Sequence, residues 1–506
     1  MCKCCGDMNR RHFMGLTAGM IAGAALASAV EPGGSLDPGL WDPAKPYAIP
    51  GKPLIVQPVL MFRVSEPREA SSWKSWGGVQ SVQAASKEAS RIAGELAAMT
   101  AGAEFPIEVR PVVSVRSKEE LDVVHATDYD VILVYAATGS GDLLRACLSP
   151  RGNTIVFVRH LSGPVYYWYE ALSVKYLTDD AAKEGPPRRV GFDDVVVDDY
   201  GEVLWRLRAL YGAKNFLGAR VVALGGVGGK YADEAPRDAQ SRYGMELIDV
   251  GYDVFAPRLE RALADERTMK IASQWTDAYL AMPDTELKTD RTFVVNAFVL
   301  YALFKELIRE HDAAAFTIQH CMGTILPMAK TTACLTLGLL NDEGLLAFCE
   351  SDFVVIPAGI LLHYVSGKPV FMHNSTFPHK GVVTCAHCTA PRRMDGARYE
   401  PAEILTHYES EFGAAPKVTV PVGQEVTFID PEYSTGRWIG LKGTVEGNPF
   451  LDICRSQQDV RIQGDWKRLI REVRDSHWMM AYGGYLDELG YAARKIGVQW
   501  DCIEPV

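Results

Sequence analysis

The sequence predicts an α/β protein with two Rossmann-like parallel-sheet domains, followed by an antiparallel, barrel-like β domain that carries a terminal helix. Short apolar segments rich in β-branched residues alternate with helical patterns over the first two thirds of the chain, which is typical of parallel β-α-β units. From about residue 367 these patterns give way to strand-like segments separated by glycine, proline and charged turns. The 506 residues suffice for about two to four domains of roughly 100–200 residues each.

Residues 1–29 have the pattern of a twin-arginine export signal. In MNRRHFMGLTAGMIAGAALASAV, Arg10 and Arg11 precede a mildly apolar stretch and a small-residue site at residues 27–29. Recurring glycines disfavour the alternative, an amphipathic helix of the first domain. Met8 is an alternative start to Met1. We therefore expect a periplasmic or otherwise extracytoplasmic protein that is exported already folded.

Residues 30–213 are predicted to form the first α/β domain. A helical pattern, VQSVQAASKEASRIAGELAAM, separates the first two of its strands. The predicted strands are residues 53–62, 107–115, 130–137 and 153–160. Residues 187–212 are predicted to supply a linker and a helix that lead into the second unit.

Residues 214–366 repeat the alternation and form the predicted second α/β domain. The strand in GARVVALGGVGGKY ends in glycines, and further elements follow in MELIDVGYDVF, NAFVLYALFKELIREH and AFTIQHC. The glycine run lacks the full GxGxxG spacing, and YADEAPRDAQ after it shows no obvious helix. We interpret the run as a tight turn where two backbones approach closely, and we expect no nicotinamide cofactor.

Residues 367–506 form the predicted β domain. Its strand-like segments are KPVFMHN, GVVTCAHC, PKVTVPV, QEVTFIDPEY and RWIGLKGTV. Helical patterns return at WKRLIREVRD and in the last segment, where Leu486, Leu489 and Ala492 recur at helical spacing.

Composition excludes few functions. Apolar residues make up 48% and charged residues 23% of the chain, as in ordinary globular proteins. The net charge of −11 gives no reason to expect nucleic acid, and no stretch reaches the roughly 18 apolar residues of a membrane span. Three of the 11 cysteines would leave with the signal. CAHC at 385–388 matches a zinc or redox pair poorly because no second CxxC exists after residue 29, so most cysteines are interpreted as buried thiols.

Candidate chemistry begins at CESDFVV, where Glu350 and Asp352 stand at the start of an apolar run. A solvated turn is the simpler explanation, so a functional one needs partners. Three of the 11 histidines, His373, His387 and His477, lie where a predicted strand or helix ends beside small or polar residues. Side chains at such ends can converge in a cleft between domains.

Four blocks of the sequence resemble the C-terminal half of the L-fucose and L-arabinose isomerase family. They are LGLLNDEGLLAFCESDF, LLHYVSGKPVFMHN, GVVTCAHCTAP and SHWMMAYGGYLDELGYAARKIGV. The resemblance covers about residues 330–506, and before residue 330 it rests only on the repeated α/β pattern. It implies an aldose–ketose isomerase that uses a divalent metal, usually Mn²⁺, with Zn²⁺ or Co²⁺ as alternatives. It also implies a small-molecule sugar as substrate and a homo-oligomer, either a trimer or a hexamer.

The resemblance assigns roles by position. Glu350 and His373 become the catalytic residues, and the metal ligands are Glu350, His373, His387 and His477. Asp352 and Asn374 would support these ligands. The family carries an acid where this chain has His373, which removes a carboxylate from the expected site and makes Zn²⁺ a stronger candidate. Lower-ranked candidates for contact with the sugar are His320, His379, Arg392 and Trp478.

The residue types suit the implied reaction. Moving a carbonyl between C1 and C2 needs a base for the C2 proton, an acid for the carbonyl oxygen and stabilisation of a cis-enediol. A divalent cation can hold both oxygens and polarise the carbonyl. An imidazole with an ordinary pKa near 6.5 can serve as the base.

Two other classes of function stay open. An exported, non-catalytic sugar-binding protein on an isomerase scaffold would explain the missing carboxylate. A metal-dependent hydrolase or lyase could use the same pocket, although the chain has no HExxH motif.

Overall fold

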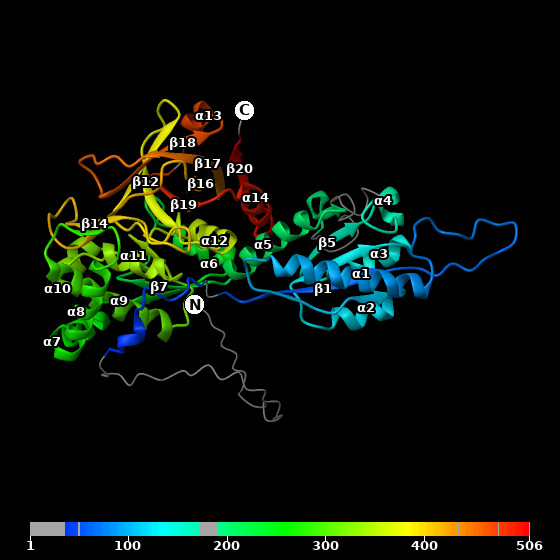
Figure 1. Cartoon of the computed structure of the whole chain (residues 1–506), viewed down its shortest axis with the longest axis horizontal. Helices are drawn as coiled ribbons and strands as arrows, with labels where there is room; N and C mark the ends of the chain where they lie inside the picture. Colours follow the sequence, from blue (N-terminus) through cyan, green and yellow to red (C-terminus); the bar gives the residue numbers. More distant parts are fainter. Residues whose placement is uncertain (1–35, 49–50, 173–189, 433–435, 474, 505–506) are drawn as a thin grey trace, which may run out of the picture.

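The structure is a computed structural model that describes residues 36–48, 51–172, 190–432, 436–473 and 475–504. The predicted export signal lies outside the described residues. The chain is mixed α/β, with parallel-sheet regions and a closed antiparallel barrel in its C-terminal part (Figure 1). The predicted fold class is confirmed at this level.

The first parallel sheet has the order β2-β1-β4-β5-β6, with β3 also paired to β1. Its central strands are almost fully buried and apolar, as strands covered on both faces must be. The predicted strand at 107–115 is interrupted at Pro111, which has no N–H to donate, and becomes β2 and β3. The strands are β1 (Leu54–Met61), β2 (Ile107–Val109), β3 (Val113–Val115), β4 (Val131–Ala136), β5 (Asn153–Val158) and β6 (Val195–Val197).

Serine residues begin three of the helices around this sheet. Ser81, Ser117 and Ser140 each accept a hydrogen bond from the backbone N–H three residues later, which satisfies an otherwise unpaired donor. The helices are α1 (Val82–Ala101), α2 (Lys118–His125), α3 (Gly141–Cys147) and α4 (Tyr167–Ala171).

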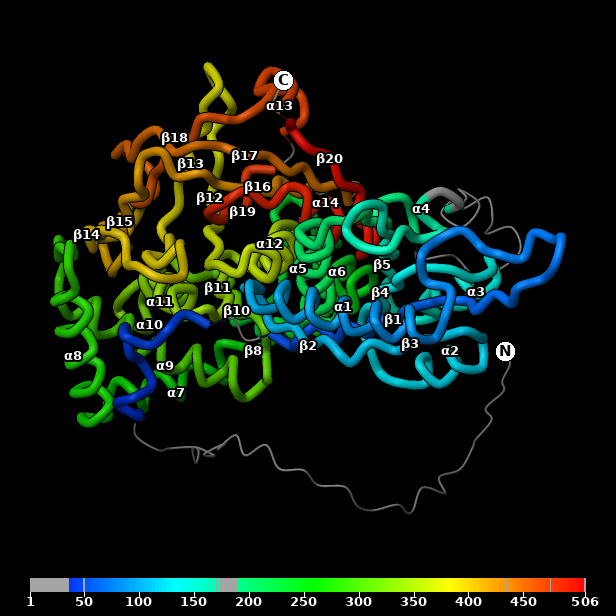
Figure 2. The backbone as a smooth tube through the Cα atoms, turned by 45° about the vertical axis from the view of Figure 1, so that its right-hand side comes forward, coloured from blue at the N-terminus to red at the C-terminus, as the bar shows by residue number. Residues whose placement is uncertain are grey.

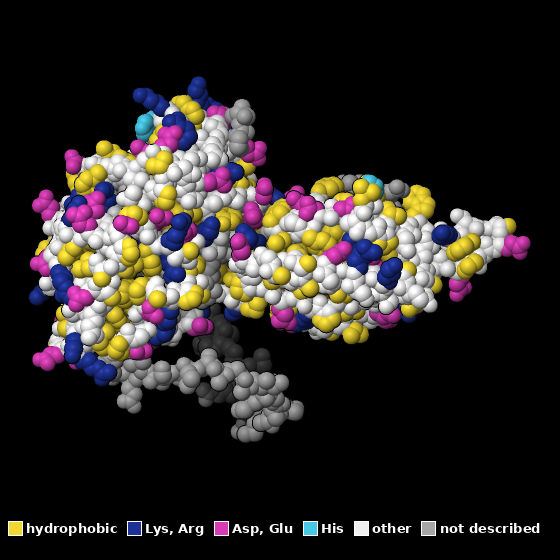
Figure 3. Space-filling view, viewed as in Figure 1, with side chains coloured by type: hydrophobic (Ala, Val, Ile, Leu, Met, Phe, Trp, Pro, Cys, Tyr) yellow, Lys and Arg dark blue, Asp and Glu magenta, His cyan; other side chains and the backbone are white. Residues whose placement is uncertain are grey.

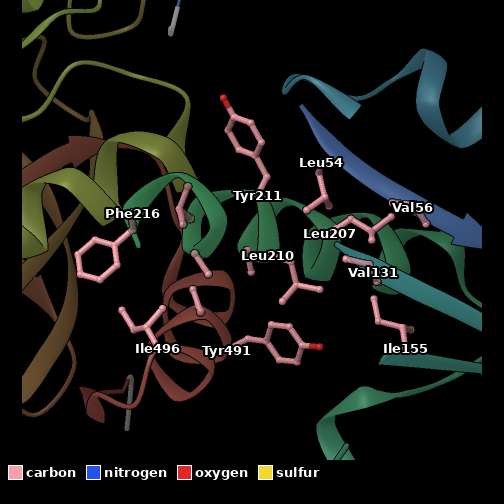
Figure 4. Packing of buried hydrophobic residues seen from close by; sticks show 14 of the residues in the cluster. Leu54, Val56, Val131, Ile155, Leu207, Leu210, Tyr211, Phe216, Tyr491 and Ile496 are labelled. Carbon is pink, nitrogen blue, oxygen red and sulfur yellow. The ribbon is translucent and has the colours of Figure 1, made fainter. Parts of the chain in front are cut away.

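Helix α5 (Tyr200–Phe216) joins the two lobes of the molecule. Figure 4 shows its Leu207 and Leu210 beside Leu54 and Val131 of the first sheet, while Tyr491 approaches from α14 (Leu486–Lys495). The Tyr491 hydroxyl donates a hydrogen bond of 2.5 Å to the buried carboxylate of Asp194. The lobe built on the first sheet projects from the rest of the molecule (Figures 1 and 2). The apolar packing around α5 connects this lobe to the remainder of the chain.

The second parallel sheet has the order β11-β10-β7-β8. Its strands are β7 (Arg220–Leu224), β8 (Glu246–Val250), β10 (Ala315–Ile318) and β11 (Leu346–Cys349). The expectation that no helix follows the glycine run is wrong, because α6 begins at Ala235 with Pro236 in its first turn, where no hydrogen bond is lost. The helices are α6 (Ala235–Tyr243), α7 (Tyr252–Ala264), α8 (Glu266–Leu280), α9 (Arg291–Glu310), α10 (Leu326–Ala329), α11 (Cys334–Asp342) and α12 (Ile356–Ser366), with a π-helix (Cys321–Ile325) before α10.

The barrel closes in the order β16-β19-β12-β13-β18-β17, because β16 also pairs with β17. Its strands are β12 (Phe371–Ser375), β13 (Val382–His387), β16 (Glu425–Pro431), β17 (Arg437–Gly447), β18 (Ser456–Gln463) and β19 (His477–Tyr482). Strand β20 (Gln499–Ile503) adds to β17 in parallel, and α13 (Trp466–Glu472) precedes β19. Figures 1 and 2 both place the barrel over α11 and α12 of the second parallel region.

The predicted strand PKVTVPV does not join the barrel. Its first residues form β15 (Ala415–Val418), which belongs to a separate small sheet with β14 (Ala402–Leu405) and β9 (Thr285–Leu287). Strand β9 comes from the second α/β region, so this sheet ties that region to the C-terminal part of the chain.

The segment at residues 36–48 packs on the second α/β region, although the predicted boundary places it in the first domain. The buried ring of Trp41 lies 4.9 Å from that of Phe298 in α9. Among the described residues no single helix is long and apolar enough to cross a membrane. One pair, Cys321–Ala329 and Cys334–Asp342, passes jointly on length and composition with a bend of 92°.

Candidate metal centre

The carboxyl edge of the second parallel sheet faces the barrel and carries most of the candidate chemistry. Glu350 follows the last residue of β11, His320 comes two residues after β10, and the glycine run follows β7. Parallel strands present their carboxyl ends at one edge, and ligands of open α/β sheets bind there. The sheet therefore brings together loops that are more than a hundred residues apart in sequence.

The turn at residues 350–352 has a constrained backbone. Glu350 and Ser351 have φ values of 63° and 48°, a left-handed conformation that non-glycine residues seldom adopt. Backbone hydrogen bonds to the glycine run hold it, from Gly228 N to Ser351 O (3.2 Å) and from Phe353 N to Gly228 O (3.0 Å). The interpretation of the glycines as a close approach of two backbones is confirmed. Strain of this kind is retained where the surrounding structure holds a functional geometry.

Glu350, His387 and His477 form a cluster whose candidate ligand atoms all lie within 4.8 Å of one another. Glu350 Oε1 is 3.9 Å from His387 Nε2, and Glu350 Oε2 is 3.7 Å from His477 Nε2. Ligands at about 2.1 Å from one cation lie roughly 3–3.5 Å apart, so only a small closure is needed to hold an ion. The Glu350 side chain is 48% exposed whereas both imidazoles are buried, which leaves the carboxylate side open to a substrate.

Asp352 orients His477. Its Oδ2 lies 2.7 Å from His477 Nδ1, and its Oδ1 accepts hydrogen bonds from the backbone N–H groups of Lys230 and Val354. A buried carboxylate at Nδ1 keeps the proton there and leaves Nε2 free to bind a cation. Asp352 therefore contacts one of the candidate ligands, and the supporting role that the resemblance implies for it stays a prediction.

Lys230 also belongs to the cluster, and the sequence analysis did not identify it. Its Nζ atom lies 3.3 Å from His477 Nε2 and 3.9 Å from Glu350 Oε2. The signal was its place directly after the glycine run, at the carboxyl end of a buried strand. The cluster thus combines one carboxylate and two imidazoles with a neighbouring ammonium group.

The electrostatic surroundings keep Glu350 ionised. Its interaction with His387 is the main cause that lowers the pKa of the Glu350 carboxyl to about 2. Burial acts in the opposite direction, and the charges of His477 and Lys230 add to the lowering. The side chain is therefore a carboxylate at neutral pH, the form that binds a cation.

The structure does not bring His373 into this cluster. In the pairing of β12 with β19, His373 is opposite Trp478, whereas Asn374 is opposite His477. Because successive strand residues point to opposite faces, His373 and His477 lie on different faces of the barrel wall, and Asn374 shares the face of His477.

The His373 ring packs among aromatic side chains. Its ring centroid lies 5.5 Å from those of both Phe371 and Phe428, and burial lowers its pKa to about 3. The charges of His387 and His477 also act on the ring and lower its pKa. The Nδ1 atom of His373 lies 3.3 Å from Ser375 Oγ, and its buried Nε2 atom has no partner among the described residues.

The lower-ranked candidates are divided by position. His320 is exposed and lies at the same sheet edge as Glu350, because Ile318 and Cys349 are paired at the ends of their strands. His379 is exposed in the turn between β12 and β13. Arg392 and Trp478 are fully buried, and both donate hydrogen bonds to backbone carbonyls, so neither side chain is available to a substrate.

No protein-family model matches the sequence, and no curated protein matches it at a significant level. The isomerase resemblance therefore rests on the four sequence blocks alone.

Proposed function

We propose that the protein is a metal-dependent aldose–ketose isomerase that converts a sugar through a cis-enediol intermediate. The observation that carries this proposal is the cluster of Glu350, His387 and His477 at the carboxyl edge of a parallel sheet, open on the side of the carboxylate. We also propose that the two parallel-sheet regions are separate Rossmann-like domains, and that the protein acts as an extracytoplasmic trimer or hexamer.

The donor set supports a divalent cation. One carboxylate and two imidazoles suit Mn²⁺, Zn²⁺ or Co²⁺, and three protein ligands leave coordination positions for substrate oxygens. We propose Mn²⁺, with Zn²⁺ or Co²⁺ as alternatives. Bound there, such a cation would polarise the sugar carbonyl and hold two adjacent oxygens.

The neighbouring side chains can stabilise the enediol, transfer the C2 proton and bind a sugar hydroxyl. The Lys230 ammonium lies beside both Glu350 and His477, so it can donate a hydrogen bond to an oxygen that gains negative charge in the enediol. Exposed His320, at the adjacent strand end, is the imidazole best placed to move the C2 proton. Asn374 shares the face of His477 and can hydrogen bond a sugar hydroxyl, whereas buried His373 takes no part in this scheme.

A second candidate function is a sugar-binding protein without turnover. The observation that favours it is the short distance of 3.3 Å between Lys230 Nζ and His477 Nε2. An ammonium group this close to a ligand nitrogen repels a divalent cation and could take its place beside the carboxylate.

Metal analysis separates the two candidates. Elemental mass spectrometry of the purified protein is expected to find one equivalent of Mn²⁺, Zn²⁺ or Co²⁺ more in wild type than in Glu350→Gln, and no such difference between wild type and Glu286→Gln, a control at an exposed glutamate of β9. A screen of aldoses and ketoses on the loaded protein should then show isomerisation that is absent from Glu350→Gln. Metal content equal in wild type and Glu350→Gln, combined with sugar binding without conversion, would favour the binding protein.

A further inference from the structure

A second group of metal-binding side chains lies next to the first. The candidate ligand atoms of Cys334, Cys388 and His407 all lie within 4.8 Å of one another. The three residues come from different parts of the chain: Cys334 begins α11, Cys388 directly follows β13, and His407 lies beyond β14. All three are buried, so the fold has placed three strong ligands together in the interior.

The histidine of this group points to a missing partner. His407 is only 5% exposed, and its Nδ1 atom is buried with no hydrogen-bond partner among the described residues. A buried polar atom without a partner costs free energy, so native proteins satisfy nearly all of them.

The sulfur atoms are also arranged for a shared ion. Cys334 Sγ and Cys388 Sγ are 3.2 Å apart, and both cysteines are free. Two thiolates of one tetrahedral zinc lie roughly 3.8 Å apart, given Zn–S distances of about 2.3 Å. A separation larger by about half an ångström would accommodate the ion.

Cys454 is a candidate for the fourth ligand. Cys454, two residues before β18, is only partly buried and lies near enough to Cys388 to interact with it, although it is outside the group of three whose ligand atoms are within 4.8 Å of one another. Three cysteines and one histidine are a common ligand set of closed structural zinc sites.

We propose that Cys334, Cys388 and His407, completed by Cys454, form a second metal site that binds a thiolate-preferring cation of the zinc type. The site differs from the first by chemistry, because sulfur ligands select softer ions than carboxylates do. It also has a structural consequence. Cys388 follows His387, so an ion held there would fix the end of β13 and the imidazole that faces Glu350.

Cobalt binding tests the proposal on the full-length protein. The protein is reduced with a phosphine, stripped with a chelator and titrated with Co²⁺ without oxygen. A thiolate-to-cobalt charge-transfer absorption is expected, since only sulfur ligands produce it. The band should disappear in Cys388→Ser and Cys334→Ser. It should persist in Cys385→Ala, a matched control three residues from Cys388, and in Glu350→Gln, which separates this site from the first.

A second measurement covers the case that the serine variants do not fold. X-ray absorption at the zinc edge of the wild-type protein should show sulfur neighbours at about 2.3 Å. A spectrum with nitrogen and oxygen neighbours only would overturn the proposal. So would a fully reduced wild type without a charge-transfer band, or a disulfide between Cys334 and Cys388 in the protein before reduction.

Discussion

Among single residues, Lys230 is expected to affect both the affinity of the candidate centre for a cation and its turnover. Its ammonium lies within 4 Å of both Glu350 and His477 and repels any cation placed between them. In Lys230→Met we therefore expect the affinity for Mn²⁺ to rise about tenfold, equivalent to about 1.4 kcal/mol, while isomerase turnover falls.

Calorimetric titration with Mn²⁺ measures the affinity, and Lys87→Met, an exposed lysine of α1, serves as the control. An unchanged affinity in Lys230→Met would show that the ammonium does not compete with the ion. A turnover equal to that of wild type would remove Lys230 from the proposed chemistry.

Buried His373 should make the stability of the protein depend on pH. Its pKa is about 3 in the folded protein, below the ordinary value of about 6.5, because burial disfavours the charged ring. Between these values the unfolded chain binds a proton that the folded chain does not, so stability is lost as pH falls from about 6.5 towards 3. In His373→Leu we expect this loss to be smaller by roughly 2 kcal/mol between pH 6.5 and 5.

Urea unfolding at a series of pH values measures the difference. His363, whose pKa burial lowers to about 4, remains in both proteins and supplies a common background. The metal content of His373→Leu should equal that of wild type. Loss of the metal in this variant would restore the ligand role that the sequence resemblance assigned to His373.

The sequence could not show on which face of β12 His373 lies, and the reason is physical. Phe371, Met372 and His373 are all buried, and Phe371 and Met372 belong to different core clusters, so both faces of β12 are covered. The alternation that tells the two faces of a strand apart is therefore absent from KPVFMHN. Only the register with β19 shows that Asn374, and not His373, shares the face of His477.

Among the elements of the site, the glycine run leaves little room for an added side chain. Gly225 has a φ of 83°, and a Cβ atom there would lie 2.3 Å from Tyr252 Cε2 and 3.0 Å from the backbone oxygen of Gln319. Gly225→Ala must therefore move the loop, and we expect a loss of stability of about 2–4 kcal/mol together with weaker metal binding.

Gly218→Ala is the matched control. Its φ is 71°, but the nearest atom to its added Cβ is 4.0 Å away, so only the backbone strain applies. We expect a cost of about 1 kcal/mol there and no change in metal binding. Thermal unfolding and metal titration of both variants check the difference, and equal costs would mean that the crowding at Gly225 is relieved without effect.

Local patterns predicted the elements that local forces determine. The β-branched strands of both parallel sheets, the helical spacing of α1, α9 and α14, and the glycine turn all appear in the structure. The separate sheet of β9, β14 and β15 could not be predicted, because its pairing joins Thr285 to Ala402 across more than a hundred residues. Lys230 was missed for the same reason, since its partners come from distant strands.

At the scale of the whole molecule, both signs of charge are interspersed over the face shown in Figure 3, and the lobe of the first sheet extends away from the body. The candidate site lies in the body, between the second sheet and the barrel, and the lobe is joined to this body through α5. The strength of the packing between α5 and both parts determines whether the lobe and the body unfold together.

Leu210 lies in the packing that connects the lobe to the body. It is 1% exposed within the core shared by the first sheet, α5 and α14 (Figure 4). Truncation to alanine removes buried methyl groups and leaves a cavity, so we expect Leu210→Ala to lose about 2–4 kcal/mol of unfolding free energy. Leu217→Ala, at a leucine that is 47% exposed just after α5, should change it by less than about 0.5 kcal/mol.

Denaturant unfolding followed by circular dichroism and tryptophan fluorescence gives the answer. Because α5 contributes buried residues to the core of the lobe and also packs on α12 and α14, both probes should report one transition that moves to lower denaturant in Leu210→Ala. Two separate transitions, of which Leu210→Ala shifts only the first, would mean that the lobe unfolds alone. In that case the body, which carries Glu350 and both candidate metal sites, would be stable without the folded lobe. At denaturant concentrations above the first transition, Leu210→Ala would then bind as much metal as wild type.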